Sequence, residues 1–200
     1  LGHLKNEKKN LFFCSIIKIM GSIWILLCLE KLIKEHQPKS ILEIGMAVGY
    51  SASVMLSVSD AHITCLEASH PNIVEAKTNF ANLGLENRVT IIEGDCIKTL
   101  PNLTGQFDFI FLDGPKGKYL DMIPLILPLL SKNGIWLSDN VLFRGMVNGE
   151  REISEHRFIH TVGVLREFLD ILKRDERLNT NIHSIGDGLC EVRFKEGKNE

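Results

Sequence analysis

The sequence predicts a doubly wound α/β fold built on a mostly parallel sheet. Short apolar runs alternate with segments of helical periodicity along most of the 200 residues. Such alternation is typical of parallel strands connected by helices that cover both faces of the sheet. Near the carboxyl end, Gly186-Asp187-Gly188 separates two strand-like runs and is typical of a hairpin turn. We therefore expect a seven-stranded sheet whose last two strands add an antiparallel edge.

The expected elements follow from apolar periodicity and from turn residues. A helix through about Glu35 precedes the first strand, and a second helix ends near Val58. Pro71–Leu83 is expected to be helical, with Pro71 in its first turn and Gly84 as its stop. Helical sequence also joins the fourth and fifth strands, and Ser154–Arg174 is a long amphipathic helix. The strands are expected at Ser40–Gly45, His62–Glu67, Arg88–Glu93, Phe107–Leu112, Gly134–Ser138, Asn181–Ile185 and Leu189–Phe194.

Composition indicates one globular domain. At 44% hydrophobic and 24% charged residues, the chain can bury one full core and leaves little room for a second. The net charge of −2 does not indicate a protein that coats nucleic acid, although a local basic patch remains open. The five cysteines are scattered and lack metal-binding spacing, which predicts reduced thiols and a cytoplasmic protein.

The segment Leu11–Leu29 has two interpretations. It is mostly apolar and follows the basic run Lys5–Lys9, as a signal peptide or membrane anchor would. Lys18 lies in its middle, where a charge is costly in a bilayer, and the following residues continue as an amphipathic helix. We therefore expect buried helices that cover a ligand site, without stable membrane association. The expected organisation is an N-terminal helical cap at 1–39, a main domain at 40–195 and a flexible tail at 196–200.

Polar side chains follow two neighbouring strands. Asp113-Gly-Pro-Lys116 comes directly after Phe107–Leu112, and Asp139-Asn140 directly after Gly134–Ser138. Because neighbouring parallel strands end at the same edge of a sheet, these residues are expected to converge. Two carboxylates, an amide oxygen and a lysine suit a hard cation with a base beside it. The alternative is structural: Asp113 caps a helix, Asp139-Asn140 forms a turn and Lys116 is solvated.

Three further segments indicate a nucleoside site at the same edge. The loop from Glu43 to Ser51 contains Gly45 and joins the first strand to its helix, where glycine lets the backbone approach a ligand. Glu67 ends the second strand and can accept hydrogen bonds from both ribose hydroxyls. Asp95-Cys96 follows the third strand and can meet an adenine ring. The structural alternatives are glycines for tight packing, an acidic helix start at Glu67 and an N-cap at Asp95.

Several stretches resemble one enzyme family. The segments ILEIGMAVGYSA, ITCLEA, VTIIEGDC, FDFIFLDGPKGKY and GIWLSDNVLFRG are similar to class I S-adenosylmethionine-dependent methyltransferases, which have a Rossmann-like fold. They most resemble the metal-dependent O-methyltransferases that include catechol and caffeoyl-CoA enzymes. LSDNVLFRGMV and SIGDGL are similar to the bacterial branch that contains the tRNA 5-hydroxyuridine methyltransferases. Residues 1–39 match worst, and only Lys18-Ile19-Met20 resembles the segment whose methionine touches the cofactor.

The resemblance implies roles for individual residues. It implies that Mg²⁺ or another divalent cation is held by Asp113, Asp139 and Asn140. It also implies that Lys116 is the catalytic base, with Asp113 as the second catalytic residue. The residues implied to bind S-adenosylmethionine are Met20, Glu43, Gly45, Ser51, Glu67, Asp95, Cys96 and Asp113.

The acceptor remains open between two kinds of molecule. The first is 5-hydroxyuridine in tRNA, methylated to 5-methoxyuridine, because its 5-hydroxyl and O4 are vicinal oxygens that can share a cation. The alternative is a small catechol or other phenol. Lys118, Arg144 and Arg151 are candidates for phosphate contacts at the mouth of the site, or are simply solvated. A cofactor-binding module without catalysis is a third hypothesis, and the resemblance also implies a homodimer.

Overall fold

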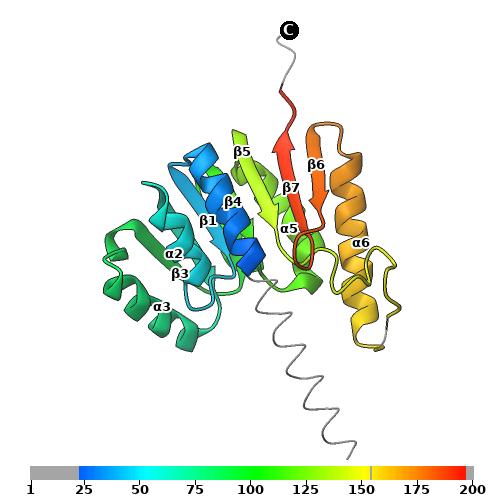
Figure 1. The fold of residues 1–200 in the computed structure, drawn as a ribbon, viewed down its shortest axis with the longest axis horizontal. Helices are drawn as coiled ribbons and strands as arrows, with labels where there is room; N and C mark the ends of the chain where they lie inside the picture. Colours follow the sequence, from blue (N-terminus) through cyan, green and yellow to red (C-terminus); the bar gives the residue numbers. More distant parts are fainter. Residues whose placement is uncertain (1–22, 154, 197–200) are drawn as a thin grey trace, which may run out of the picture.

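A computed structural model describes residues 23–153 and 155–196. Its centre is a seven-stranded sheet in the order β3-β2-β1-β4-β5-β7-β6 (Figure 1). Strands β1 to β5 are parallel, and β7 runs antiparallel to both β5 and β6. The predicted doubly wound fold with a closing hairpin is confirmed. The strands are β1 (Ser40–Ile44), β2 (His62–Glu67), β3 (Val89–Glu93), β4 (Phe107–Leu112), β5 (Leu130–Ser138), β6 (Leu178–His183) and β7 (Leu189–Phe194).

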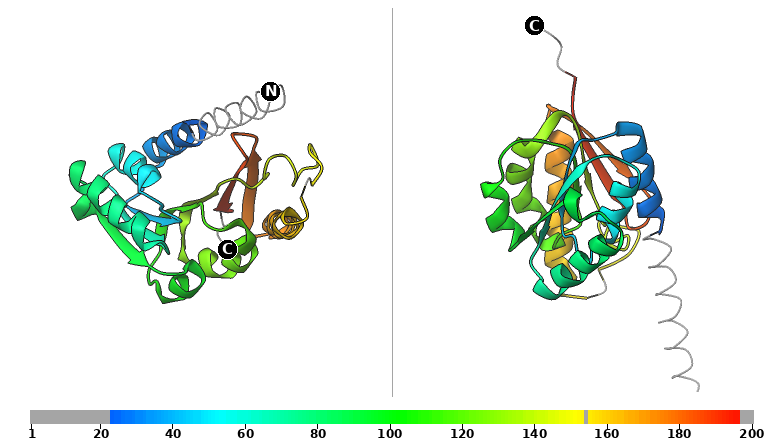
Figure 2. Two further views of the ribbon diagram at one scale, coloured as in Figure 1. Left: turned by 90° about the horizontal axis from the view of Figure 1, so that it is seen from below. Right: turned by 90° about the vertical axis from the view of Figure 1, so that its left-hand side faces the viewer.

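Helices cover both faces of this sheet. One face carries the helix at residues 23–36 together with α2 (Tyr50–Ser57) and α3 (His70–Asn82). The other face carries α4 (Cys96–Thr99), α5 (Tyr119–Ile126) and α6 (Phe158–Arg174) (Figure 2). Each face has its own apolar cluster, since strand residues alternate between the two sides. Short 3₁₀ turns lie at Glu86–Arg88, Leu100–Asn102, Lys116–Lys118 and Leu127–Leu129.

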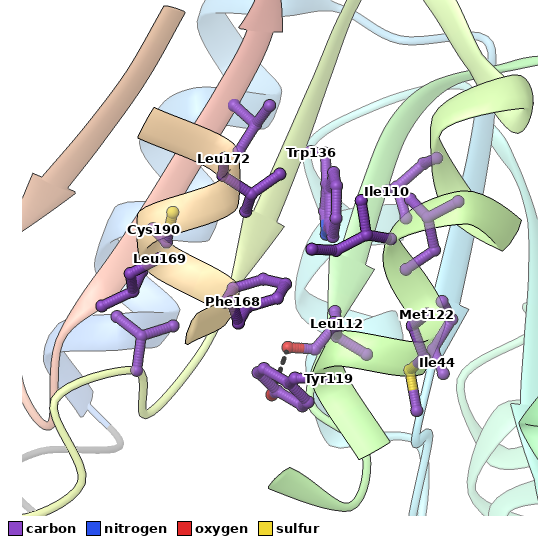
Figure 3. Packing of buried hydrophobic residues seen from close by; sticks show 14 of the residues in the cluster. Ile44, Ile110, Leu112, Tyr119, Met122, Trp136, Phe168, Leu169, Leu172 and Cys190 are labelled. Carbon is purple, nitrogen blue, oxygen red and sulfur yellow. Dashed lines mark hydrogen bonds between the residues drawn. The ribbon is translucent and has the colours of Figure 1, made fainter. Parts of the chain in front are cut away.

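An aromatic group forms the centre of the larger cluster. Trp136 of β5, Tyr119 of α5 and Phe168 of α6 are all fully buried (Figure 3). The ring centroid of Phe168 lies 5.3 Å from that of Tyr119 and 5.8 Å from that of Trp136. Tilted and edge-on rings at such distances are favourable, and they bury large apolar areas. This packing joins α5 and α6 to the part of the sheet from which the polar residues emerge.

Most predicted boundaries agree with the structure within two residues, and three do not. Strand β5 begins at Leu130 rather than Gly134, because Leu130 pairs with Phe107 across an irregularity in the ladder. Strand β6 begins at Leu178 rather than Asn181, because Leu178 extends the hairpin by pairing with Phe194. Helix α6 begins at Phe158 rather than residue 154, which lies outside the described residues.

The amino-terminal expectations are only partly covered by the structure. Residues 23–36 are helical, and Ile25, Leu29 and Ile33 pack into the apolar cluster of the α2 and α3 face. Within the described ranges, no helix is long and apolar enough to cross a membrane. Met20 and most of the segment Leu11–Leu29 lie outside the described residues. The cap predicted at 1–39 therefore stays a prediction.

Candidate functional site

The polar residues predicted to converge do share one edge of the sheet. After β1 the backbone N–H of Gly45 donates to Leu66 O of β2 at 2.9 Å. Asp113 N donates to Ile44 O, and Asp139 N donates to Leu112 O, each also at 2.9 Å. Each strand therefore stays paired with its neighbour up to its last residue, so the residues that follow leave the sheet at the same edge. Crevices at the carboxyl ends of such strands are where ligands bind in open α/β sheets.

A pocket of ≈ 480 Å³ opens along this edge. It draws its lining from the ends of β1, β2, β3 and β4, and its volume is in the usual range for a small-molecule site. Five residues predicted from the sequence line it, and Lys118 and the backbone of the Gly114-Pro115 turn close one side. The five are Gly45, Glu67, Asp95, Cys96 and Asp113.

Residue 45 is a glycine because the backbone of Asp113 passes too close to leave room for a side chain. Its φ angle is +93°, a conformation that side chains of L-residues rarely adopt. A Cβ atom at this position would lie 2.5 Å from Asp113 O and 2.8 Å from Asp113 C. The glycine thus allows the turn after β1 to lie directly against the turn after β4, which places the β1 side of the pocket next to Asp113.

Glu67 and Asp95 both line the pocket, and both also accept hydrogen bonds from backbone N–H groups. The two oxygens of Glu67 accept hydrogen bonds from Ala47 N and Ser69 N, each at 2.8 Å. Asp95 caps α4 by accepting from Ile97 N at 2.9 Å, as the structural alternative required. These bonds fix the orientation of both carboxylates. Each carboxylate has further lone pairs that remain able to accept from hydroxyl or amino groups of a ligand.

Glu43 and Ser51, also predicted from the sequence, are not among the residues that line the pocket. Glu43 is fully buried and accepts hydrogen bonds from Ser51 Oγ and, at 3.4 Å, from Cys65 Sγ. Burial raises the pKa of the Glu43 carboxyl to about 8, although the Ser51 and Cys65 bonds act in the opposite direction. The Glu43–Ser51 hydrogen bond links β1 to the start of α2. Contact of either residue with a cofactor stays a prediction.

Asp113, Lys116, Asp139 and Asn140 form the second half of the site. Lys116 Nζ lies 2.5 Å from Asp113 Oδ1, and its side chain is only 15% exposed. Asp139 is buried, and Asn140 N donates to its Oδ1 at 2.6 Å. Asn140 has a φ of +57°, a conformation that asparagine tolerates better than most residues. The two acidic groups predicted from the sequence are thus brought together with the lysine, and Asn140 directly follows Asp139.

The charges of this group fit a divalent cation. Burial, and then the negative charge of Asp113, raise the pKa of Asp139 to about 7, although Lys116 acts in the opposite direction. Two carboxylates held this close favour a cation between them, and oxygen-only ligands suit Mg²⁺. No group of three or more His, Cys, Asp or Glu side chains with metal-binding geometry occurs among the described residues. Asn140 would therefore have to supply the third ligand.

Basic and aromatic residues cluster in the segment after β5 and at the start of α6, and this cluster of Arg144, Arg157 and Phe158 is here called the rim. The guanidinium carbons of Arg144 and Arg157 lie 5.6 and 4.8 Å from the centroid of the Phe158 ring. Arg144 N donates to Asp187 Oδ1 at 2.7 Å, which ties this segment to the turn between β6 and β7. The sequence marked Asp187 only as part of a turn, and it gave no signal for Arg157 and Phe158. Of the three basic residues predicted at the mouth of the site, Lys118 lines the pocket, whereas Arg144 and Arg151 do not.

Comparisons with known proteins agree with this arrangement. The family model described as O-methyltransferase matches residues 26–195. Tapetum-specific methyltransferase 1 of Arabidopsis thaliana is 31% identical over 174 residues, covering 84% of this chain and 74% of that protein. A caffeoyl-CoA O-methyltransferase of Populus kitakamiensis is 28% identical over 175 residues, covering 82% and 74%.

A solved structure is similar to this protein in fold as well as in sequence. The SAH-bound methyltransferase PaMTH1 of Podospora anserina superposes with a TM-score of 0.77 at 33% identity. The match covers 84% of this chain and 76% of PaMTH1. The resemblance to class I S-adenosylmethionine-dependent O-methyltransferases is thereby confirmed, and the chain belongs to the O-methyltransferase family.

Proposed function

We propose that this protein uses S-adenosylmethionine and a divalent cation to methylate a hydroxyl that is vicinal to a second oxygen. Mg²⁺ is the first candidate for that cation. The observation that carries the proposal is the group formed by Asp113, Lys116, Asp139 and Asn140 beside the pocket. S-adenosylmethionine supplies the methyl group. A bound cation lowers the pKa of a coordinated hydroxyl and supplies charge stabilisation.

The residues of the chain divide this work between two halves of the site. Glu67 and Asp95, held by backbone N–H groups, would orient the ribose and the base of the cofactor. Asp113, Asp139 and Asn140 would hold the cation. Lys116 lies against Asp113 in a sheltered position and, in its neutral form, would accept the proton of the acceptor hydroxyl. The close approach of Gly45 to Asp113 fixes the positions of the two halves of the site relative to each other.

For the acceptor we propose 5-hydroxyuridine in tRNA. Its 5-hydroxyl and O4 provide the two vicinal oxygens, and its phosphates would meet the rim. The guanidinium groups of Arg144 and Arg157 both lie over the Phe158 ring and support an acceptor that carries negative charge, although Arg157 also pairs with Glu155 at 2.7 Å. Lys118 adds a third positive group beside the pocket.

A second candidate acceptor is a catechol or phenol of the caffeoyl-CoA type. The relative from Populus kitakamiensis is named for that substrate, and this favours the same chemistry here. A CoA ester also carries phosphates, so a basic rim suits both candidates. The two therefore differ in the ring that is methylated rather than in the charge of the acceptor.

The test is methyl transfer from labelled S-adenosylmethionine to three acceptors, each with Mg²⁺ or with EDTA. The acceptors are tRNA that contains unmethylated 5-hydroxyuridine, caffeoyl-CoA and a simple catechol. EDTA-sensitive labelling of tRNA alone is the expected result. Labelling of caffeoyl-CoA or catechol alone would replace the proposed acceptor and keep the chemistry. Labelling that persists in EDTA would refute the proposed use of a cation.

A further inference from the structure

Tyr119 bridges the ends of the two strands that carry the acidic residues of the site. It is fully buried at the first position of α5. Its hydroxyl lies 3.1 Å from Leu112 O and 3.0 Å from Asp139 O, so its single O–H hydrogen is shared between these two carbonyls. A dashed line in Figure 3 marks the bond to Leu112. One carbonyl precedes Asp113 directly and the other precedes Asn140, so the phenol links both segments with candidate cation ligands.

The ring of the same residue contacts the remaining member of the group. Lys116 Nζ lies 5.4 Å from the centroid of the Tyr119 ring, within the range of a cation–π interaction. Phe168 packs against the ring from α6 at 5.3 Å between centroids. The ring is therefore fixed from one side by the core, while Lys116 lies over it.

The two carbonyls depend on the hydroxyl to different degrees. Leu112 O also accepts from Asp139 N at 2.9 Å, so it keeps a partner without the phenol. Asp139 O lies beyond the last pair of the β4–β5 ladder, which ends at Leu112 and Ser138. Removal of the hydroxyl would therefore act mainly at Asp139 and Asn140, where the chain leaves β5 and where a buried carbonyl needs a donor.

We propose that Tyr119 is a positioning residue for the cation site: its hydroxyl fixes the ends of β4 and β5 relative to each other. This inference rests on the proposed use of a cation. Residues that orient ligands without touching the metal typically change its affinity 10–100-fold when they are replaced.

The test is Tyr119→Phe in the full chain, with Mn²⁺ as the probe and binding followed by electron paramagnetic resonance. The substitution keeps the ring and removes the two hydrogen bonds. We expect Mn²⁺ to bind about 10-fold more weakly, as for other residues that orient ligands. Affinity for S-adenosylhomocysteine should stay within a factor of about 2 of the wild type, because β1, β2 and β3 supply most of that pocket.

Phe168→Leu is the matched control. It loosens the packing around the Tyr119 ring but leaves the hydroxyl and both carbonyls in place. Thermal unfolding of both variants gives the loss of stability against which the Mn²⁺ affinities are compared. We expect Phe168→Leu to lower stability and keep the Mn²⁺ affinity. Equal loss of Mn²⁺ affinity in both variants, or none in Tyr119→Phe, would overturn the inference.

Mn²⁺ binding by the wild type distinguishes a failure of this inference from a failure of the proposed function. Wild-type protein that binds no Mn²⁺ would refute both. Wild-type binding that Tyr119→Phe retains in full would refute only the role of Tyr119. Should Tyr119→Phe not fold, fluorotyrosine can be used, because the chain has only two tyrosines. In Tyr50→Phe labelled in this way, Mg²⁺ should shift the single remaining fluorine resonance, and an unchanged resonance would contradict the proposal.

Discussion

Gly45→Ala should destabilise the protein more than Gly84→Ala, although both glycines have positive φ angles. Gly84, at +66°, has no atom within 4 Å of an added Cβ. There the cost is the left-handed conformation alone, about 1–2 kcal/mol. Part of it is offset by about 0.4–1 kcal/mol from the stiffer unfolded chain, which leaves a net loss of roughly 1 kcal/mol. Gly45 adds a contact of 2.5 Å with Asp113 O. Overpacking of this kind costs about 1–3 kcal/mol, for a total of roughly 2–4 kcal/mol.

Thermal unfolding of the two variants measures this difference. A loss of 1 kcal/mol lowers the Tm of a chain of this size by about 2–4 °C, so Gly84→Ala should lie in that range and Gly45→Ala about 4–16 °C below the wild type. Gly45→Ala should also lose methyl-transfer activity, since relief of the contact displaces Asp113. Equal shifts in Tm for the two variants, with activity retained in both, would refute the argument that the close contact between residue 45 and Asp113 requires a glycine.

Three other substitutions test separate parts of the structure. Wild-type stability should fall as pH rises from about 4.5 to about 8, because folded Glu43 keeps a proton that the unfolded chain releases. Glu43→Gln should make this fall smaller in urea unfolding measured between pH 5 and 8.5. Arg88 donates to the carbonyls of Leu56, Ser59 and Ala61, so Arg88→Ala should lose about 2–4 kcal/mol of stability in the same assay without loss of activity at 25 °C. Asp187→Ala should raise the KM for the acceptor about fivefold, the equivalent of one hydrogen bond of about 1 kcal/mol, because Arg144 N loses its partner.

Each of these expectations has a distinct contrary result. An equally steep pH dependence in Glu43→Gln would mean that Glu43 is already ionised in the folded protein. Unchanged stability in Arg88→Ala would show that water replaces its hydrogen bonds at no cost. A KM that Asp187→Ala leaves unchanged, with a lower Tm, would limit Asp187 to a structural role in the hairpin.

The sequence predicted two strands of the parallel part of the sheet well. His62–Glu67 and Phe107–Leu112 match β2 and β4 residue for residue, because each is a short run that contains several buried apolar residues and lies between turn residues. The edge strand β6 was harder. Three consecutive polar residues, Asn179 to Asn181, separate its apolar residues, and its start is set by the pairing of Leu178 with Phe194 rather than by any local signal.

The site was predictable to the extent that it follows from the ends of strands. Parallel pairing brought Asp113, Asp139 and Asn140 to one edge, as their positions after two apolar runs indicated. Contacts between distant segments were not predictable. The bond between Arg144 and Asp187 joins residues 43 positions apart. The sequence likewise gave no sign that the Tyr119 hydroxyl meets two strand ends.

The most direct test of the account compares methyl transfer by the wild type and by Asp139→Asn, each with Mg²⁺ and with EDTA. The acceptor is whichever of tRNA, caffeoyl-CoA or catechol the wild type labels. We expect that only the wild type with Mg²⁺ is active, while both proteins bind S-adenosylhomocysteine with similar affinity. Wild-type activity that is undiminished in EDTA, or Asp139→Asn activity equal to that of the wild type, would contradict the assignment of this group as a cation site.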